Sequence, residues 1–303
     1  MKKIVFLVSL MMGLLVSAQK KGNEYMLFFL GGQSNMDGYG YVKELPDSLT
    51  KKMKDVYIFH GNTVVDGTTE GGGLGIWSKL QPGHGTGFVS NGEKNTYSDR
   101  FGVELSFAYM LKQKYPDKKI ALIKYSRGGT SIDSIAALDW AGCWEPDFNG
   151  RKGLNQYDYF LTTMKNALKA GDIDGDGKAN TLKPSGILWM QGEQDASYDE
   201  AVALRYYDNL KRLMDLIRAS MLTDDLPVVI GKISDSWNTD EGKVWPYGEL
   251  VQYAQEKFAK TDGNAAIVRT TRYYGYSDTW HYNSEGYIDF GKQFALKMIP
   301  LLK

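Results

Sequence analysis

Residues 27–36 read Leu27-Phe28-Phe29-Leu30-Gly31-Gly32-Gln33-Ser34-Asn35-Met36, and this stretch decides the predicted fold. A continuous apolar run that ends in paired glycines is typical of a buried parallel strand. The residues after such a strand lie at the carboxyl edge of the sheet, where open α/β sheets carry their sites. Ser34 is therefore a candidate nucleophile. The alternative is an ordinary loop whose polar side chains satisfy backbone groups.

The rest of the chain repeats the order of strand, loop and helix. Short apolar runs predict further strands at 55–59, 119–125, 187–190, 227–233 and 265–269. Apolar residues at helical spacing predict helices at 103–115, 157–170, 199–219, 247–260 and 283–302, the last with Asn283 as its N-cap. Residues 61–95 are rich in glycine and predict a long loop. This order predicts an α/β fold with a mostly parallel sheet and helices on both faces.

The first residues differ in kind from the rest of the chain. Lys2 and Lys3 precede an apolar run over 4–16, and small residues follow up to Ala18. This order of charged, apolar and small residues is typical of a secretory signal. We expect cleavage after Ala18, one domain over residues 19–303, and a location in the periplasm or outside the cell. No cysteine follows the apolar run, so we expect no lipid anchor.

The composition is that of an ordinary globular protein. Lys and Arg number 36, as do Asp and Glu, so the charge gives no support for binding to nucleic acid or to an anionic membrane. Cys143 is the only cysteine, which excludes an intrachain disulfide. The many aromatic residues in polar, glycine-rich loops suit a surface that faces sugars. No motif indicates a particular oligomeric state.

His281 is the candidate base for Ser34. It lies in a polar loop before the last predicted helix, three residues after Asp278. A carboxylate at that spacing can reach the imidazole, fix its tautomer and stabilise the imidazolium that forms when the ring takes a hydroxyl proton. Ser34, His281 and Asp278 therefore form a candidate triad. Of the other two histidines, we expect His60 in the core or a loop and His84 at the surface.

An ester hydrolase also needs donors for the developing oxyanion. The sequence offers three kinds after successive predicted strands: the backbone N–H of Ser34, that of Gly128 or Gly129, and a side-chain amide from Gln191 or Gln194. Each of these is also explained by an ordinary strand-to-helix turn or a loop hydrogen bond. Their joint occurrence at one edge of the sheet favours the catalytic interpretation.

Asp172, Asp174 and Asp176, followed by Gly177, resemble the first half of a calcium loop. The position at which a glutamate closes such a loop is Lys183, so the helix-loop-helix pattern fails. A tight acidic turn is the simpler interpretation, and a structural calcium ion is the alternative.

Four blocks of the sequence together resemble the SGNH-type hydrolases, and more closely their sialate O-acetylesterase and acetylxylan esterase branch of carbohydrate esterases. They are Gly32-Gln33-Ser34-Asn35-Met36, Arg127-Gly128-Gly129-Thr130, Trp189-Met190-Gln191-Gly192-Glu193-Gln194-Asp195 and Asp278-Thr279-Trp280-His281. They occur in family order over most of the chain. The serine block and the Gln-Gly-Glu block are specific, whereas the Asp-x-x-His block alone is weak.

The resemblance implies a flavodoxin-like three-layer sandwich with five central parallel strands, and release of acetate from acetylated sugars without a metal. Carried over by position, Ser34 is the nucleophile, His281 the general base and acid, and Asp278 its orienting partner. Ser34 with Gly128 or Gly129 supplies amides of the oxyanion hole.

The third block departs from the superfamily pattern, in which an Asn supplies the third oxyanion donor. This chain has Gln191 and Gln194 there, and we expect Gln191 to take the role. Arg127 is expected to orient a sugar or a carboxylate, or to pair with an Asp, and Glu193 to contact substrate or to structure its loop. Gln33 and Asn35 complete the expected substrate contacts.

The sequence thus predicts a secreted serine esterase that removes O-acetyl groups from a carbohydrate, such as a sialic acid or xylan, through an acetyl-serine intermediate. One alternative is an esterase, lipase or thioesterase of the same superfamily that acts on a non-sugar ester. Another is a carbohydrate-binding protein without catalysis. An ordinary α/β-hydrolase is disfavoured, because no Gly-x-Ser-x-Gly elbow surrounds Ser34.

Overall fold

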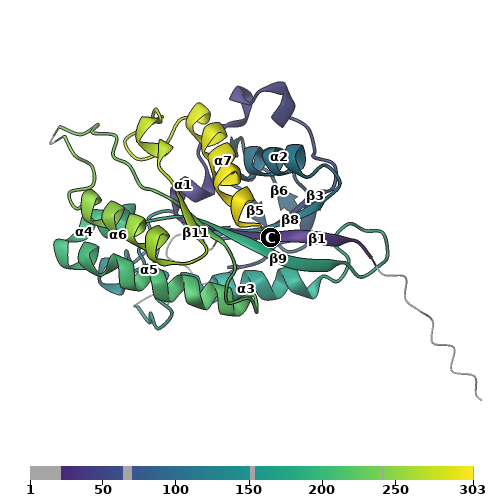
Figure 1. The fold of residues 1–303 in the computed structure, drawn as a ribbon, viewed down its shortest axis with the longest axis horizontal. Coiled ribbons are helices and arrows are strands. Elements are labelled where there is room, and N and C mark those ends of the chain that lie inside the picture. The colour runs from purple at the N-terminus through teal and green to yellow at the C-terminus, as the bar shows by residue number, and fades with distance from the viewer. Residues whose placement is uncertain (1–21, 64–69, 151–153, 241, 303) are drawn as a thin grey trace, which may run out of the picture.

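A seven-stranded sheet forms the centre of the computed structural model, which describes residues 22–63, 70–150, 154–240 and 242–302 (Figure 1). From edge to edge its strands are β11 (Ala265–Val268), β10 (Val228–Gly231), β9 (Thr181–Met190), β1 (Glu24–Gly32), β8 (Lys119–Ser126), β3 (Val56–His60) and β4 (Trp77–Lys79). The first six are parallel, and β4 pairs antiparallel with β3 at the edge. The connection after β1 leads to β3 on one side of the sheet, whereas the connection after the neighbouring β9 leads to β10 on the other side. Open α/β sheets bind ligands where neighbouring connections diverge in this way.

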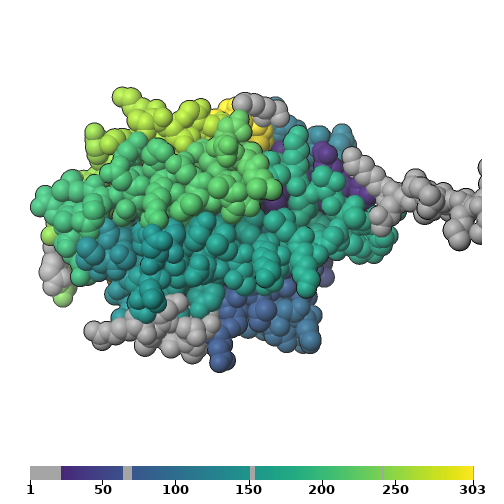
Figure 2. Space-filling model, turned by 90° about the horizontal axis from the view of Figure 1, so that it is seen from below, coloured from purple at the N-terminus to yellow at the C-terminus, as the bar shows by residue number. Residues whose placement is uncertain are grey.

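Helices cover both faces of this sheet. Figure 1 shows α2 (Glu104–Lys114) and α7 (Ser284–Met298) above it, and α3 (Gln156–Lys169), α5 (Glu200–Ser220) and α6 (Gly248–Thr261) below it. Seen from below, the surface is made largely of the teal and green middle of the chain (Figure 2). Within the described ranges, no helix has both the length and the apolar character to cross a membrane.

Shorter elements occupy the connections, mostly near the carboxyl ends of the strands. They are α1 (Ser34–Asp37), α4 (Glu193–Tyr198), the ribbon of β2 (Gly40–Tyr41) with β7 (Arg100–Phe101), the ribbon of β5 (Val89–Ser90) with β6 (Asn95–Thr96), and 3₁₀ turns at Val42–Glu44, Asp47–Leu49, Ser134–Ala136, Thr270–Tyr273 and Ile299–Leu301.

The predicted α/β fold class is confirmed, with a mostly parallel sheet between layers of helices. The five predicted helices are present, and the Asn283 side chain caps α7 by accepting from the Gly286 N–H at 2.9 Å. The sheet is larger than the five parallel strands implied by the resemblance, since β11 adds a sixth and β4 an antiparallel edge. β4, β5 and the first residue of β6 lie in the stretch expected as loop, and α4 is an additional short helix. The predicted signal sequence lies outside the described residues.

β1 is the structural centre because both of its faces are covered. Phe28, Phe29 and Leu30 have no exposed surface, and they sit in register with β8 on one side and β9 on the other. A strand buried on both sides needs a continuous apolar run and not an alternating one, as observed here. Each such side chain stabilises the fold by about 1.5–3 kcal/mol through burial.

Gly32 ends β1 at a position that only glycine fits. Its φ is +144°, and a Cβ built there would lie 1.9 Å from the Met190 carbonyl oxygen of β9. That carbonyl accepts the Gln33 N–H at 2.9 Å, so the chain turns toward Ser34 while in contact with the neighbouring strand. The turn therefore depends on the missing side chain.

We expect Gly32→Ala to destabilise the protein by about 3 kcal/mol or more, because the clash is with backbone and the φ value is unfavourable. The free energy of unfolding from urea titration measures this loss. Gly263→Ala is the control, because a Cβ at Gly263 meets nothing within 4 Å. Equal stability of the two variants would contradict the argument.

Candidate active site

Ser34 lies at the start of α1, at the carboxyl end of the central strand. It is 8% exposed and lines a cavity of about 910 Å³. Cavities of this size are at the upper end of the usual range for small-molecule sites. The strand that precedes Ser34 is fixed on both sides, so its hydroxyl is presented from a rigid support.

Asp278 and His281 lie in the loop before α7 and form a close pair. The Nδ1 atom of His281 is 2.8 Å from one Asp278 carboxylate oxygen, and the other oxygen accepts the backbone N–H groups of Trp280 and His281 at 2.7 and 2.8 Å. The carboxylate thus fixes both the loop and the ring. With Nδ1 held in this way, Nε2 is the ring nitrogen that remains for proton transfer.

The pKa values of this pair follow from their surroundings. Burial lowers the pKa of His281 below its ordinary value of 6.5, although the hydrogen bond and charge of Asp278 oppose this effect. Burial alone would raise the pKa of Asp278, but the hydrogen bonds from His281 and the backbone hold it below its ordinary value. The result at neutral pH is a neutral imidazole beside an ionised carboxylate, as a general base requires.

Ser34 and His281 line the same cavity. Within the described ranges the Ser34 hydroxyl makes no hydrogen bond to the ring, which is common in unliganded sites whose catalytic contacts shorten when substrate binds. The structure therefore brings Ser34 and His281 to one cavity, and Asp278 contacts the His281 ring without lining that cavity.

Tyr39 is a contact of His281 that the sequence did not predict. Its ring stacks on the imidazole with centroids 3.5 Å apart and planes within 3° of parallel. The Arg100 guanidinium donates to the Tyr39 carbonyl at 2.7 Å and so fixes its backbone. Tyr39 therefore shields one face of the base from water and limits its rotation. No local spacing connects residues so far apart in the chain.

Asn35 joins the segment that carries Ser34 to the loop that carries His281. Its Nδ2 donates to Glu193 Oε1 at 2.9 Å and to the Trp280 carbonyl at 3.1 Å, and its Oδ1 accepts the Tyr287 hydroxyl at 2.7 Å. Asn35 is buried and does not line the cavity. The structure thus gives it a positioning role in place of the expected contact with substrate.

Glu193 is likewise part of the scaffold. It is 2% exposed, does not line the cavity, and has one carboxylate oxygen without a partner in the described part of the chain. Burial raises its pKa to about 7, an effect that the Asn35 hydrogen bond partly offsets. Of the two roles considered from the sequence, organisation of the loop fits this position and direct contact with substrate does not.

The candidate oxyanion donors divide into two groups. Gly128 lies beside Ser34, since a Cβ on Gly128 would be 3.4 Å from the Ser34 Cβ, and Gly129 also lines the cavity. The Arg127 N–H donates to the Gly32 carbonyl at 3.1 Å, which joins the ends of β8 and β1. The two glycines therefore lie near Ser34, and their role as oxyanion donors stays a prediction.

Gln191 does not fit the expected role of third donor. It has no exposed surface, and its Nε2 donates to the Thr130 carbonyl at 2.8 Å and to Asp195 Oδ2 at 2.7 Å. Both amide hydrogens are thus used within the scaffold. Gln194 and Gln33 do line the cavity. The Oε1 atom of Gln33 accepts the Gly192 N–H at 3.2 Å, which leaves its amide nitrogen for a ligand.

Arg127 lines the cavity near Trp140. Its guanidinium lies 5.4 Å from the Trp140 ring centroid and donates to the Trp140 carbonyl at 3.2 Å. This position fits a role in orienting a bound group, as expected, and it also supports the Trp140 loop. Both roles considered from the sequence therefore remain predictions.

A buried ionic cluster lies beneath α1. The Lys124 ammonium has no exposed surface and donates to Glu104 Oε2 at 2.9 Å and to the carbonyls of Asp37 and His84 at 2.7 Å. His84 is fully buried, so its expected place at the surface is wrong. His60 is in the core, with its Nδ1 3.4 Å from that of His84. These histidines have strongly lowered pKa values because of their burial.

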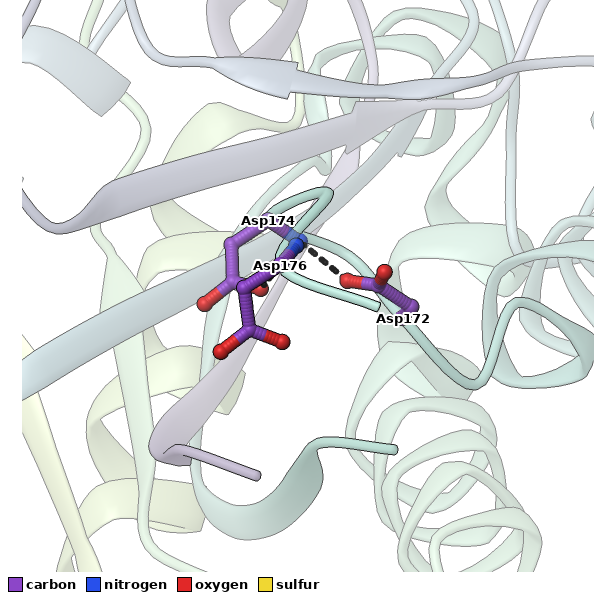
Figure 3. A group of neighbouring side chains, drawn as sticks. All are labelled: Asp172, Asp174 and Asp176. Atoms are coloured by element: carbon purple, nitrogen blue, oxygen red, sulfur yellow. Dashed lines mark hydrogen bonds between the residues drawn. The ribbon is translucent and has the colours of Figure 1, made fainter. Parts of the chain in front are cut away.

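The acidic turn of Asp172, Asp174 and Asp176 is separate from the cavity that Ser34 lines. Each residue offers an oxygen within 4.8 Å of the others, and Figure 3 shows the three side chains around one turn. One Asp172 oxygen accepts the Gly175 N–H at 2.8 Å, and Asp174 accepts the Tyr25 hydroxyl at 2.6 Å. Internal hydrogen bonds thus account for much of this geometry, and the calcium site stays a prediction.

Comparison with known proteins identifies the family. Residues 24–300 match the family described as carbohydrate esterase, sialic acid-specific acetylesterase, and the chain belongs to it. It is therefore a carboxylic ester hydrolase, of a class that removes O-acetyl groups from carbohydrates. No curated protein matches the sequence closely enough to serve as a relative.

Solved structures share the fold at low sequence identity. A protein from Arabidopsis thaliana is 19% identical, with a TM-score of 0.62 over 93% of this chain and 99% of that one. A carbohydrate acetylesterase from Xanthomonas citri is 16% identical, with a TM-score of 0.59 over 91% of this chain and 56% of that one. NanS is 15% identical, with a TM-score of 0.56 over 92% and 98%.

We expect kcat/KM to fall at low pH with a midpoint below 6.5, because only the neutral ring accepts a proton and burial lowers the pKa of His281. Tyr39→Ala should move this midpoint upward, since it exposes one face of the imidazole to water. Tyr39→Phe keeps the stacked ring and should keep the midpoint. Initial rates from pH 4 to 8 measure these changes, and a midpoint that Tyr39→Ala leaves in place would contradict the role of stacking.

Glu193→Gln tests the buried carboxyl. Its pKa is about 7 when folded and ordinarily 4.5, so the folded state binds more protons and stability falls as pH rises through that window. By linkage, the loss approaches about 3 kcal/mol above pH 7. We expect the variant to be more stable than the wild type at pH 8 and to lose this advantage at pH 4.5. Urea unfolding at both values measures it, and a difference independent of pH would contradict the assignment.

Proposed function

We propose that the protein removes O-acetyl groups from carbohydrates through an acetyl-serine intermediate. Ser34 attacks the acetyl carbonyl as His281 takes its proton, and the sugar oxygen leaves with that proton. Water then attacks the acetyl-enzyme, with His281 again as base, and releases acetate. The observation that carries this proposal is the 2.8 Å contact of Asp278 with His281 Nδ1, on a ring that shares its cavity with Ser34.

The oxyanion that forms on the carbonyl is stabilised by donors near Ser34. We assign the backbone N–H groups of Ser34 and of Gly128 or Gly129 to this role, and the Gln33 side-chain amide as third donor in place of Gln191. Each donor contributes about 3 kcal/mol of transition-state stabilisation in comparable sites. These groups supply nucleophile, base and electrostatic stabilisation, so the proposed reaction uses no metal.

The substrate in this proposal is an acetylated sugar, either a sialic acid or a plant polysaccharide such as xylan. Three tryptophans, Trp140, Trp245 and Trp280, line the cavity together with polar side chains. Such a mixture suits a ligand with apolar C–H faces and polar hydroxyl edges. We also propose secretion, on the basis of the residues up to Ala18.

Ser34→Ala and His281→Ala should each lower kcat by about 10³-fold or more with p-nitrophenyl acetate, because each removes a group that acts in the chemical step. Asp278→Asn should also lower kcat, because an amide can no longer hold His281 in the tautomer that accepts the Ser34 proton. Acetate release from acetylated xylo-oligosaccharides and O-acetylated sialic acids identifies the sugar.

Ser220→Ala is the control, since the Ser220 hydroxyl lies at the end of α5 and donates to the Ile217 carbonyl of the same helix. Circular dichroism and thermal unfolding establish that all variants fold. Retained activity in folded Ser34→Ala would reject the mechanism. Hydrolysis of p-nitrophenyl acetate without release of acetate from any sugar would reject the carbohydrate substrate.

A further inference from the structure

The exposed tryptophans of this protein gather at one end. In the part of the chain that the structure describes, the exposed ones are Trp140, Trp237 and Trp280, at 41%, 62% and 52%. All three follow strands at the carboxyl edge of the sheet, and Trp140 and Trp280 line the cavity together with Trp245. We call these four residues the tryptophan rim. Large exposed apolar side chains that cluster beside a cavity mark a binding surface.

Trp237 extends this rim beyond the cavity. It follows β10 and does not line the cavity itself. Figure 1 shows the segment between β10 and α6 projecting at the upper left, past the end of the sheet. The Ser236 hydroxyl donates to the Thr279 carbonyl at 2.8 Å, which ties the base of the segment to the loop of the catalytic histidine. The segment that carries the exposed Trp237 ring is thus held next to the loop of His281.

The segment is built to hold its tryptophans. The Asp235 carboxylate accepts the backbone N–H groups of Trp237 and Trp245 at 2.8 Å and of Val244 at 3.1 Å, so both sides of the projection are fastened at one point. Three charge-assisted bonds to one side chain are stronger than neutral ones. The same carboxylate therefore orients a tryptophan inside the cavity and one outside it.

Trp237 also has a backbone conformation that bulky residues rarely adopt. Its φ is +57°, in the left-handed region. Such conformations occur where the surroundings impose them, often at ligand sites. The Lys243 ammonium lies 5.8 Å from the ring centroid, while most of the side chain remains in contact with solvent. The ring is thus displayed at the surface and not buried against the protein.

We infer that Trp237 binds a sugar residue outside the cavity, so that the preferred substrate is an acetylated oligosaccharide or polysaccharide and not an acetylated monosaccharide. The inference rests on the proposed function. The acetylated residue occupies the cavity with its ester at Ser34, and the chain leaves past Trp280 and Trp245 toward Trp237. A flat aromatic face suits the apolar face of a sugar ring and leaves its hydroxyl groups in water.

The test compares kcat/KM for each oligomer with that for its own monosaccharide. The probes are acetylated xylo-, manno- and sialo-oligosaccharides of four or more residues and the matching acetylated monosaccharides. We expect the wild type to favour at least one oligomer. Trp237→Ala should lower the oligomer-to-monosaccharide ratio about three- to tenfold through KM, a loss typical of one aromatic contact. Trp237→Phe, which keeps an aromatic face, should restore most of it.

Tyr253→Ala is the matched control, because Tyr253 is 71% exposed on α6 and lies outside the cavity lining. The inference is overturned if the oligomer-to-monosaccharide ratio of kcat/KM is one or less for every pair in the wild type, or if Trp237→Ala leaves this ratio unchanged. In either case, acetate release from a sugar still supports the proposed function. If no sugar releases acetate, calorimetric titration measures the binding of the same oligomers to Ser34→Ala. This binding tests the role of Trp237 separately from catalysis. Binding that Trp237→Ala weakens supports it, and no binding overturns it.

Discussion

The candidate active site depends on the Asn35 side chain, because this one amide joins the segment of Ser34 to the loop of His281. Its nitrogen holds the Trp280 carbonyl of the histidine loop and the buried Glu193, while its oxygen accepts the Tyr287 hydroxyl. Glu193 lies far along the chain from Trp280 and Tyr287, so Asn35 joins three segments. A buried amide whose donors and acceptor are all used permits one geometry, since any movement leaves a polar group without a partner. Asn35 therefore helps to fix the loop of His281 relative to the segment of Ser34.

A second constraint acts from below, where Lys124 holds the end of α1 through the Asp37 carbonyl and pairs with Glu104. A fully buried ion pair is not by itself a source of stability, because both charges lose their hydration. Here the ammonium has three oxygen partners, which offset that loss and fix three segments relative to one another. The short helix that begins with Ser34 is thus tied to the scaffold at both ends.

These ties also explain what the sequence predicted and what it did not. The fold class and the Asp278–His281 contact follow from local patterns, namely apolar runs, helical spacing and a carboxylate three residues from a ring. The stacking of Tyr39 on His281 and the burial of His84 depend on partners distant in the chain, which no local pattern specifies. The expected role of Gln191 is wrong because its amide donates to the Thr130 carbonyl, which is distant in the chain, and to the nearby Asp195 carboxylate.

Part of the family's sequence pattern serves to build the site, whereas other motif residues, such as Gln33 and His281, line the cavity. Asn35, Gln191 and Glu193 belong to its motifs, yet all three are buried and none lines the cavity. They hold segments around the cavity in place, and in the proposed function they do not select among acetylated sugars, because none of them lines the cavity. In the proposed function, that selection falls to side chains that line the cavity from the loops, among them Trp140 and Trp245. A scaffold fixed by internal hydrogen bonds leaves those loops free to differ, so one esterase chemistry can serve several glycans.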